Sequence, residues 1–210
     1  MKLYTLEDWI ALYDLNIPPH TKNCRYLLPG CLNILTPKNR QKLAQEPTYF
    51  FVKTHHHPYP EYFEGEYVLQ IVRHPAQVFT SYHNFIKKYY QSPKSLHDII
   101  HGNIPYGSWS EWHLAWEEIS PQLKDRFLQL KFKDVVSNQL KACEEIKNLI
   151  GLDYKADKKI PSFDELQKKS PNYYRSGKKR KLLESYSDNE LNQIQKLHGY
   201  AMEKLNYSLN

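Results

Sequence analysis

Two predominantly apolar runs stand in the first half of the chain, at residues 49–52 and 67–72, and neither alternates strictly between apolar and polar positions. Short runs of this kind are typical of strands that are covered on both faces, as in the parallel sheet of an α/β protein. The pattern therefore predicts two strands of such a sheet, each with both faces covered.

A helical pattern follows the second run directly. Pro75 fits the first position of a helix, where an N–H group is not needed. Beyond it, apolar residues recur at the three- and four-residue spacing that gives a helix one apolar face. These residues are Val78, Tyr82, Phe85, Ile86 and Tyr89. A strand that leads straight into a helix supports an α/β fold with a parallel sheet flanked by helices.

Weaker signals of the same kind fill the second half of the chain. Residues 126–132 alternate between apolar and polar and predict a further strand. A Ser-x-x-Glu capping box predicts the start of three helices, and Gly151 predicts the end of another. The three boxes begin at Ser108, Ser162 and Ser187. The length suits one well-packed domain, and we expect it to cover residues 1–210.

Aromatic and turn-forming residues add three expectations. Trp109, Trp112 and Trp116 either fill the core, the commoner place for such a cluster, or stack on a ring of a ligand. In the last helix, His198 shares the apolar stripe, and we expect it at the edge of the core. Residues 91–105 combine turn residues with a short helical pattern, and we expect a mobile lid there.

Basic and titratable side chains stand where the two apolar runs end. Lys53 and His55 follow the first run, and Arg73 follows the second. Since open parallel sheets bind ligands beyond the carboxyl ends of their strands, the sequence predicts a basic crevice there. Ser81 faces back toward the helix start, and unpaired N–H groups at a helix start attract anions, so a phosphate is one interpretation. The other is a surface arginine and a serine bonded to its own helix, and these residues alone leave both open.

The composition favours an anionic partner without naming one. The chain has 29 Lys and Arg against 23 Asp and Glu, a net charge of +6, which a nucleotide, a nucleic acid or an acidic glycan would match. Cys24, Cys31 and Cys143 are too few and wrongly spaced for a disulfide framework or zinc site, so we expect a reducing, cytoplasmic compartment. No apolar stretch has membrane-spanning length and no signal-peptide pattern is present, so we expect no membrane segment.

Histidine clusters raise the question of a metal. Residues 55–57 are three histidines, but adjacent side chains of an extended segment diverge, and no further ligands can be named. His97 and His101 share a helix face, yet the zinc-protease pattern needs Glu after its first His, where this chain has Asp98. We therefore expect no metal, and packing or hydrogen bonding for the second and third histidines of the run.

Five segments, in order along the chain, resemble motifs of the sulfotransferases that use 3′-phosphoadenosine 5′-phosphosulfate (PAPS). They are KTH at residues 53–55, RHPAQVFTSYHNF at 73–85, PYGSW with WHLAWEE at 105–118, LQLKFKDVV at 128–136 and YRSGK at 174–178. The resemblance extends from about Thr48 to the C-terminal helix, and five motifs in sequence are far more specific than any one of them.

The resemblance implies the P-loop-NTPase-like fold of that family and transfer of a sulfuryl group from PAPS to a hydroxyl of a small molecule or carbohydrate. His55 would be the general base that takes the proton of the acceptor hydroxyl, and Lys53 would stand near the transferring group. Histidine suits that role because its ordinary pKa lies near neutrality. We expect acceptor recognition in residues 91–105.

The same resemblance assigns five residues to the nucleotide. Arg73 and Ser81 would bind the 3′-phosphate, and Arg175 and Gly177 would close over it. Phe132 stands where the family has a tyrosine that contacts adenine, so stacking could survive but a hydroxyl hydrogen bond could not. The next residue is Lys in place of the family's Glu, and the family's G-D-W-K after the glycine is replaced by KKRKLLES.

One motif of the family is missing. Its members begin with a strand and a phosphate loop of the form P-K/R-S-G-T/N-T-W, and none of the seven glycines here stands in such a pattern. Loss of a central strand would leave its neighbours unpaired and would remove donors that stabilise the leaving group. We therefore expect the chain to be N-terminally incomplete, with an inactive relative that lacks the loop as the alternative.

Three hypotheses about function follow. The leading one is a PAPS-dependent sulfotransferase. The second is a non-catalytic relative that binds adenosine 3′,5′-bisphosphate or a polyanion through Arg73, Ser81 and Arg175. The third, binding to a nucleic acid, has no support beyond net charge, and we do not expect it.

Overall fold

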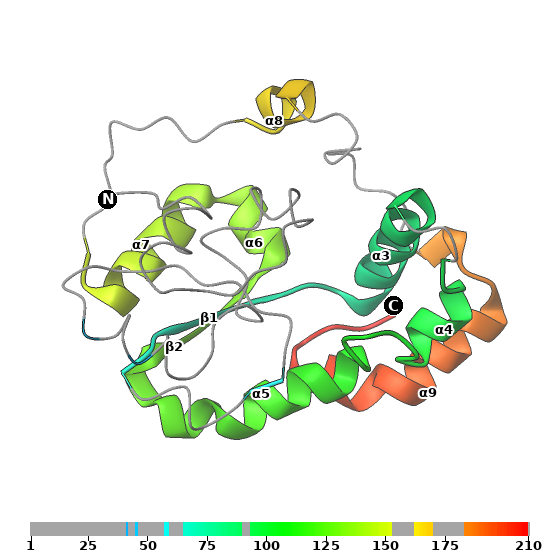
Figure 1. The fold of residues 1–210 in the computed structure, drawn as a ribbon, viewed down its shortest axis with the longest axis horizontal. Coiled ribbons are helices and arrows are strands. Elements are labelled where there is room, and N and C mark those ends of the chain that lie inside the picture. The colour runs from blue at the N-terminus through cyan, green and yellow to red at the C-terminus, as the bar shows by residue number, and fades with distance from the viewer. Residues whose placement is uncertain are drawn as a thin grey trace. The chain divides into compact units, whose positions relative to one another are not determined.

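The computed structural model describes residues 65–89, 93–152, 162–169 and 183–209, together with residues 41, 45, 57 and 58. The chain divides into two compact units, Met1–Glu66 and Tyr67–Asn210. The elements labelled in Figure 1 all belong to the second unit. The first predicted strand, at residues 49–52, lies outside the described residues.

A parallel pair of strands is the centre of the second unit. Strand β1 covers Val68–Val72 and strand β2 covers Phe127–Lys131, and Val72 lies opposite Lys131 in the register. Figure 1 shows the two strands side by side. The connection between them contains α3 (Pro75–Tyr89), α4 (Leu96–Ile100), α5 (Trp109–Leu123) and the short 3-10 helix η4 (Lys124–Arg126). Both strands predicted in this part of the chain are confirmed, and so is the parallel α/β class.

Helix α3 begins at Pro75, as predicted, and His74 caps it. The His74 carbonyl accepts the N–H groups of Gln77 and Val78 at 3.0 and 3.1 Å. Its ring Nδ1 accepts the N–H of Ala76 at 3.2 Å. Since Pro75 has no N–H, every donor of the first turn is already used. The expectation that unpaired N–H groups at this helix start attract an anion is therefore wrong, and any anion site here depends on side chains.

The capping boxes predicted from sequence are present at all three positions. Ser108 donates its N–H to Glu111 at 3.4 Å and starts α5. The same bond from Ser162 to Glu165, at 2.7 Å, starts α8 (Phe163–Lys169). Ser187 caps α9 (Asp188–Lys204), the last helix, after the 3-10 helix η5 (Leu183–Ser185).

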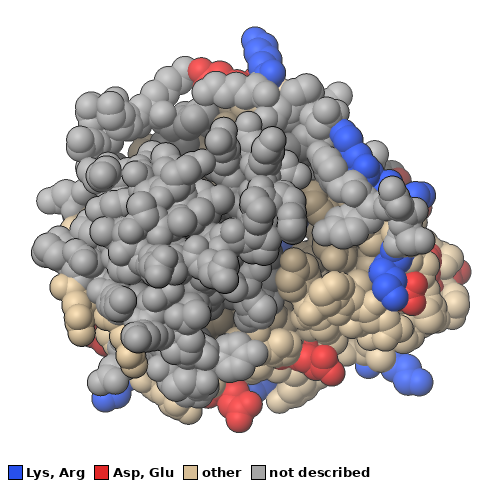
Figure 2. Space-filling view, viewed as in Figure 1, with Lys and Arg blue, Asp and Glu red and all other residues tan. Residues whose placement is uncertain are grey.

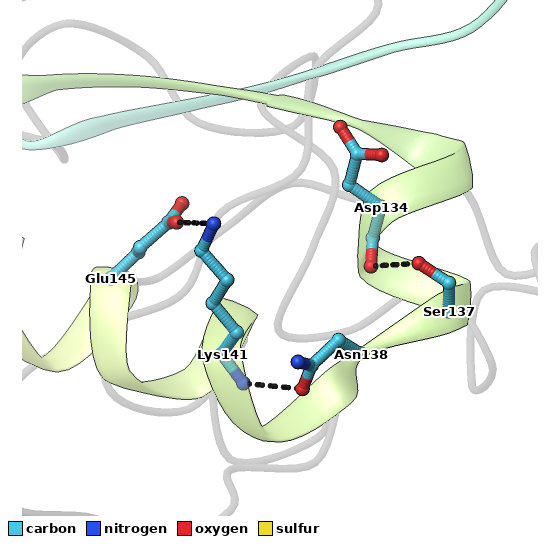
Figure 3. Close-up of polar contacts among 5 residues, drawn as sticks. All are labelled: Asp134, Ser137, Asn138, Lys141 and Glu145. Atoms are coloured by element: carbon cyan, nitrogen blue, oxygen red, sulfur yellow. Dashed lines mark hydrogen bonds and ion pairs between the residues drawn. The ribbon is translucent and has the colours of Figure 1, made fainter.

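Two short helices follow β2 and are joined by a capped turn, shown in Figure 3. Helix α6 covers Phe132–Ser137 and α7 covers Gln139–Ile150. The Asn138 side chain accepts the N–H of Lys141 at 3.0 Å and so caps α7. Gly151 ends α7 at φ 66°, in the left-handed region that glycine tolerates, which confirms the predicted end.

The hydrophobic core lies where α3, α4 and α9 meet the start of α5. Its residues are Val72, Ala76, Phe79, Ile86, Ile99, Ile100, Trp109, Tyr186, Ile194, Ala201, Met202 and Leu205. Trp109 and Trp116 are 7% and 3% exposed, so core packing is the interpretation that holds for them.

His198 belongs to the interior rather than to the edge of the core, so that expectation is wrong. It is 1% exposed, and its Nε2–H donates to the carbonyl of Ile100 at 2.8 Å. Ser110 Oγ lies 2.5 Å from Nδ1. Burial lowers the pKa of His198, which keeps the ring neutral and leaves Nδ1 as an acceptor. The imidazole therefore satisfies buried polar groups of two other helices.

Helix α4 is tied into this core, which contradicts the expected mobile lid at its position. Ile99 and Ile100 are 1% and 0% exposed, and the Ile100 carbonyl accepts the bond from His198. Opening the segment would expose both isoleucines and break that buried bond. Acceptor recognition by the neighbouring residues remains a prediction.

The two faces of β1 differ in exposure, contrary to the expectation that both faces are covered. Gln70 and Val72 are 3% and 0% exposed, whereas Leu69 and Ile71 are 40% and 49% exposed. The buried face is partly polar, because Gln70 Nε2–H donates to Nδ1 of His113 on α5 at 3.2 Å.

Among the described residues, no helix is both long and apolar enough to cross a membrane.

Candidate functional site

The described part of the candidate site lies at the carboxyl ends of β1 and β2. Val72 and Lys131 are paired in the parallel register, and the residues that follow them are Arg73 and Phe132. The guanidinium carbon of Arg73 lies 4.6 Å from the centroid of the Phe132 ring. The parallel sheet therefore brings together two of the residues predicted from sequence.

The guanidinium of Arg73 is fixed by two contacts. Its Nε–H donates to Oε1 of Gln77, one helical turn along α3, at 3.1 Å. Phe132 packs against its face in a cation–π contact. No hydrogen bond to the two terminal Nη groups is recorded within the described part of the chain. These groups present four N–H donors with the planar geometry that binds a phosphate or carboxylate in bidentate fashion.

The electrostatics of Arg73 suit an anion. Partial burial lowers its pKa and the nearby Tyr207 raises it again. An arginine side chain stays protonated throughout the ordinary pH range. Arg73 has lost part of its water and has no carboxylate partner among the described residues. A bound anion therefore stabilises this charge more than it would stabilise a fully exposed arginine.

Ser81 occupies the same side of α3 as Gln77, four residues earlier, because residues at this spacing lie above one another on a helix. Its side chain is half-buried. No hydrogen bond from its hydroxyl to α3 is recorded in the described structure, so the alternative of a serine bonded to its own helix is not what is observed. Gln77 and Ser81 therefore lie on one side of the first two turns of α3, and Arg73, just before the helix, is bonded to Gln77.

Tyr186 holds the start of α3 in place. Its hydroxyl donates to the carbonyl of Ala76 at 2.6 Å, and Thr80 Oγ1 lies 2.7 Å from the same hydroxyl. Because the phenol donates to the carbonyl, Thr80 is the donor in the second bond. Tyr186 is buried, so these bonds fix the turn of α3 that carries Gln77 and leads to Ser81.

The C-terminal residues also reach the site, which the sequence did not indicate. Tyr207 OH donates to the carbonyl of Val72 at 3.2 Å. His74 Nε2–H donates to the carbonyl of Ser208 at 3.0 Å. Pairs separated by 135 and 134 positions leave no local pattern, and no motif marked them. Lys131 was missed for the same reason, and its Nζ lies 5.1 Å from the centroid of the Tyr207 ring.

Four of the predicted site residues lie outside the described residues, so the geometry of these predictions is not tested. They are Lys53, His55, Arg175 and Gly177. His57 is described and is partly buried. The structure thus brings together Arg73 and Phe132, places Ser81 on the same helix as Gln77, and leaves the proposed catalytic residues as predictions.

The described residues offer limited material for a metal site. Within them, no group of three or more His, Cys, Asp or Glu side chains is placed to hold a metal ion. The rings of His97 and His101 stack at 4.0 Å between centroids, and His101 Nδ1–H donates to the His97 carbonyl at 2.9 Å. This pair has a structural explanation in the last turn of α4.

Figure 2 shows some of the charged side chains of the described residues on one face of the molecule. Figure 2 shows Lys and Arg side chains over α3, whose last turn carries Lys87 and Lys88, while acidic and basic side chains are scattered elsewhere among the described residues. No large patch of one sign gathers on the described surface in this view.

The parallel strand pair and the helices around it define an α/β protein, with the arginine side chain of Arg73 at the carboxyl edge of its sheet. Comparison with protein families then identifies the chain more closely, since the model of the sulfotransferase domain matches residues 5–199. The chain belongs to this sulfotransferase family. A comparison with curated protein sequences finds no match.

Solved structures agree with this assignment at the level of the fold. Mouse sulfotransferase SULT7A1 complexed with PAP has a TM-score of 0.62 and 16% identity, over 92% of this chain and 78% of the other. Retinol dehydratase, in complex with androsterone and the inactive cofactor PAP, has a TM-score of 0.56 and 16% identity, over 85% of this chain and 60% of the other. The predicted sulfotransferase fold is confirmed.

Proposed function

We propose that this protein is a sulfotransferase that uses PAPS as the sulfuryl donor and a hydroxyl of a small molecule or carbohydrate as the acceptor. The observation that carries the proposal is the Arg73 guanidinium, held on its Nε edge by Gln77 and on its face by Phe132, with its Nη groups available. The solved relatives named above contain PAP, which supports a nucleotide of this type.

The residues at the strand ends fit a nucleotide phosphate. Arg73 would bind the 3′-phosphate in bidentate fashion, and the Ser81 hydroxyl would donate a further hydrogen bond. Arg73 covers one face of the Phe132 ring, and Phe132 as a residue remains 38% exposed. That exposed part would contact adenine. Arg175 and Gly177, which lie outside the described residues, would close over the phosphate.

When bound, PAPS supplies an activated sulfuryl group. His55 would take the proton of the acceptor hydroxyl as the new O–S bond forms. The S–O bond to the nucleotide phosphate breaks in the same displacement, and its electron pair leaves with the phosphate oxygen. Lys53 would stabilise the negative charge that develops there, which is the main task of a protein in transfers of this kind.

A nucleotide-binding experiment tests the proposal first. Titration calorimetry with adenosine 3′,5′-bisphosphate and with adenosine 5′-monophosphate isolates the 3′-phosphate. We expect the bisphosphate to bind at least about tenfold more tightly, because a hydrogen bond to a charged group contributes about 1.5–3 kcal/mol. Equal affinities for the two nucleotides would overturn the assignment of Arg73 and Ser81.

A transfer experiment then separates catalysis from binding. Radiolabelled PAPS is incubated with the full chain and a panel of phenols, alcohols and monosaccharides, and labelled products are counted. Labelled product supports the transferase. Preferential bisphosphate binding with no product from any acceptor would favour the non-catalytic nucleotide-binding relative.

A further inference from the structure

The chain turns sharply after α9, and the turn sends its last residues back to the sheet. Asn206 adopts φ 55°, in the left-handed region. The N–H of Asn206 donates to the Glu203 carbonyl at 2.9 Å, and the N–H of Tyr207 donates to the Met202 carbonyl at 2.8 Å. These two bonds define a Schellman motif, which fixes the direction of the chain beyond the helix. Asn206 and Tyr207 are therefore held in place by α9.

Tyr207 meets both strands at the edge that carries the candidate site. Its hydroxyl donates to the carbonyl of Val72, the residue before Arg73, at 3.2 Å. Its ring lies 5.4 Å from the His74 ring in an edge-to-face contact. On β2, Lys131 Nζ lies 5.1 Å from the Tyr207 ring centroid and donates to the Asn206 carbonyl at 3.3 Å. Tyr207 thus contacts the residues on both sides of Arg73 and the residue before Phe132.

We propose that Tyr207 is a positioning residue of the nucleotide site, which holds the backbone around Arg73 so that its guanidinium stays against Phe132 and presents its Nη groups to the 3′-phosphate. The inference rests on the proposed function of that site. Tyr207 itself need not touch the nucleotide, because its contacts act on the backbone and on neighbouring side chains.

Two further observations support this role. Burial and the nearby Asp134 raise the pKa of Tyr207 to about 12, so its hydroxyl stays protonated and remains a donor to Val72. His74 donates through Nε2 to Ser208 and accepts through Nδ1 from Ala76, so one imidazole joins the C-terminal segment to the first turn of α3. Arg73 is therefore held through the residues on both sides of it, Val72 and His74.

Tyr207→Phe and Tyr207→Leu form a graded test. The first removes only the hydroxyl bond to Val72, and the second also removes the ring contacts to His74 and Lys131. Tyr200→Phe is the matched control, because Tyr200 lies on α9 and is 63% exposed. Each full-length variant is titrated with adenosine 3′,5′-bisphosphate and with adenosine 5′-monophosphate, and its melting temperature is measured.

We expect Tyr207→Phe to bind the bisphosphate about threefold to tenfold more weakly than the unsubstituted protein, with Tyr207→Leu weaker still. Affinity for the monophosphate and the behaviour of Tyr200→Phe should not change. In an Arg73→Gln background, Tyr207→Phe should have almost no further effect, since the two residues act on one interaction. The proposal would be overturned if Tyr207→Phe weakened the binding of both nucleotides equally. It would also be overturned if Tyr207→Phe weakened bisphosphate binding as much in the Arg73→Gln background as in the unsubstituted protein, because Tyr207 would then have only a structural role.

Hydrogen exchange provides a readout that does not need the nucleotide. In the ligand-free protein, amides of residues 72–78 should exchange faster in Tyr207→Phe than in Tyr200→Phe, while those of α5 should not change. Unchanged exchange would overturn the role of Tyr207 even if the nucleotide binds. If the unsubstituted protein shows no preference for the bisphosphate, the proposed function fails, and faster exchange would still support Tyr207 as the residue that holds Arg73.

Discussion

The guanidinium carbon of Arg73 lies 4.6 Å from the ring centroid of Phe132, and the two residues follow directly on two parallel strands. This contact joins a predicted phosphate ligand to a predicted adenine contact. The contact uses only the face of the aromatic ring, which a phenylalanine and a tyrosine share.

Removal of the arginine charge should weaken nucleotide binding selectively. Arg73→Gln keeps a side chain of polar character but loses the bidentate charged donor, so we expect at least about tenfold weaker binding of adenosine 3′,5′-bisphosphate in calorimetry. Lys196→Gln removes one positive charge from an exposed position on α9 and serves as the control for net charge. A similar loss in both variants would mean that the effect is general attraction rather than a specific contact.

Replacement of the proposed base should separate turnover from binding. His55→Ala should lower kcat at least about a hundredfold, the usual contribution of general base catalysis, and leave the affinity for adenosine 3′,5′-bisphosphate nearly unchanged. The measurement is steady-state transfer from PAPS, with the affinity taken from calorimetry. His57→Ala is the neighbouring control and should retain turnover. Retained turnover in His55→Ala would remove the proposed mechanism.

Acid should destabilise the protein through its buried histidines. Burial lowers the pKa of His113 from its usual 6.5 to about 3. Below pH 6.5 the unfolded chain therefore binds a proton that the folded state refuses until about pH 3. The free energy of unfolding falls over this window by up to about 1.4 kcal/mol per pH unit for this residue.

The His113→Gln variant tests that pH dependence. Its amide oxygen can still accept from Gln70, which donates to Nδ1 in the native protein. In urea unfolding at several pH values between 7.5 and 4.5, the free energy of unfolding should fall less steeply below pH 6.5 than in the unsubstituted protein, by up to about 1.4 kcal/mol per pH unit. His97→Gln, which removes an exposed imidazole, is the control for the loss of a histidine. If the free energy of unfolding of His113→Gln fell as steeply with pH as that of the unsubstituted protein, His113 would not be the group that causes the loss of stability in acid.

A glycine at the end of α4 should be essential for stability. Gly102 has φ +74°, and a Cβ atom there would lie 2.7–2.9 Å from the backbone and Cβ of Ser108. Gly102→Ala should therefore lower the free energy of unfolding by about 2 kcal/mol or more, since backbone strain and overlap add. Gly151→Ala is the control, with φ +66° and no atom within 4 Å, and should cost only about 1 kcal/mol. Equal losses in thermal or urea unfolding would contradict the close approach at Ser108.

Some features of the site were visible in the sequence and others were not. Arg73, Ser81 and Phe132 could be named because each stands in a short motif whose residues are consecutive or a few positions apart. Gln77 lies inside the same motif but carries no local signal, and its bond to Arg73 is seen only in the structure. The expected attraction of an anion by unpaired N–H groups at the start of α3 failed because the backbone carbonyl and the ring of His74 accept these N–H groups, and the ring bond depends on the rotamer as well as on the identity of the residue.

The sequence by itself determined the strand at the apolar run 67–72, the strand at the alternating segment 126–132, the helix starts at the capping boxes and the end of α7 at Gly151. It also determined the membership in a family. These features depend on periodicity and on hydrogen bonds between residues close together in the chain. Only the tertiary structure decided that Tyr207 contacts Val72, that His198 is buried and that Gln70 meets His113. Those contacts join residues 43 or more positions apart, or depend on which side of an element is covered, and packing alone settles such questions.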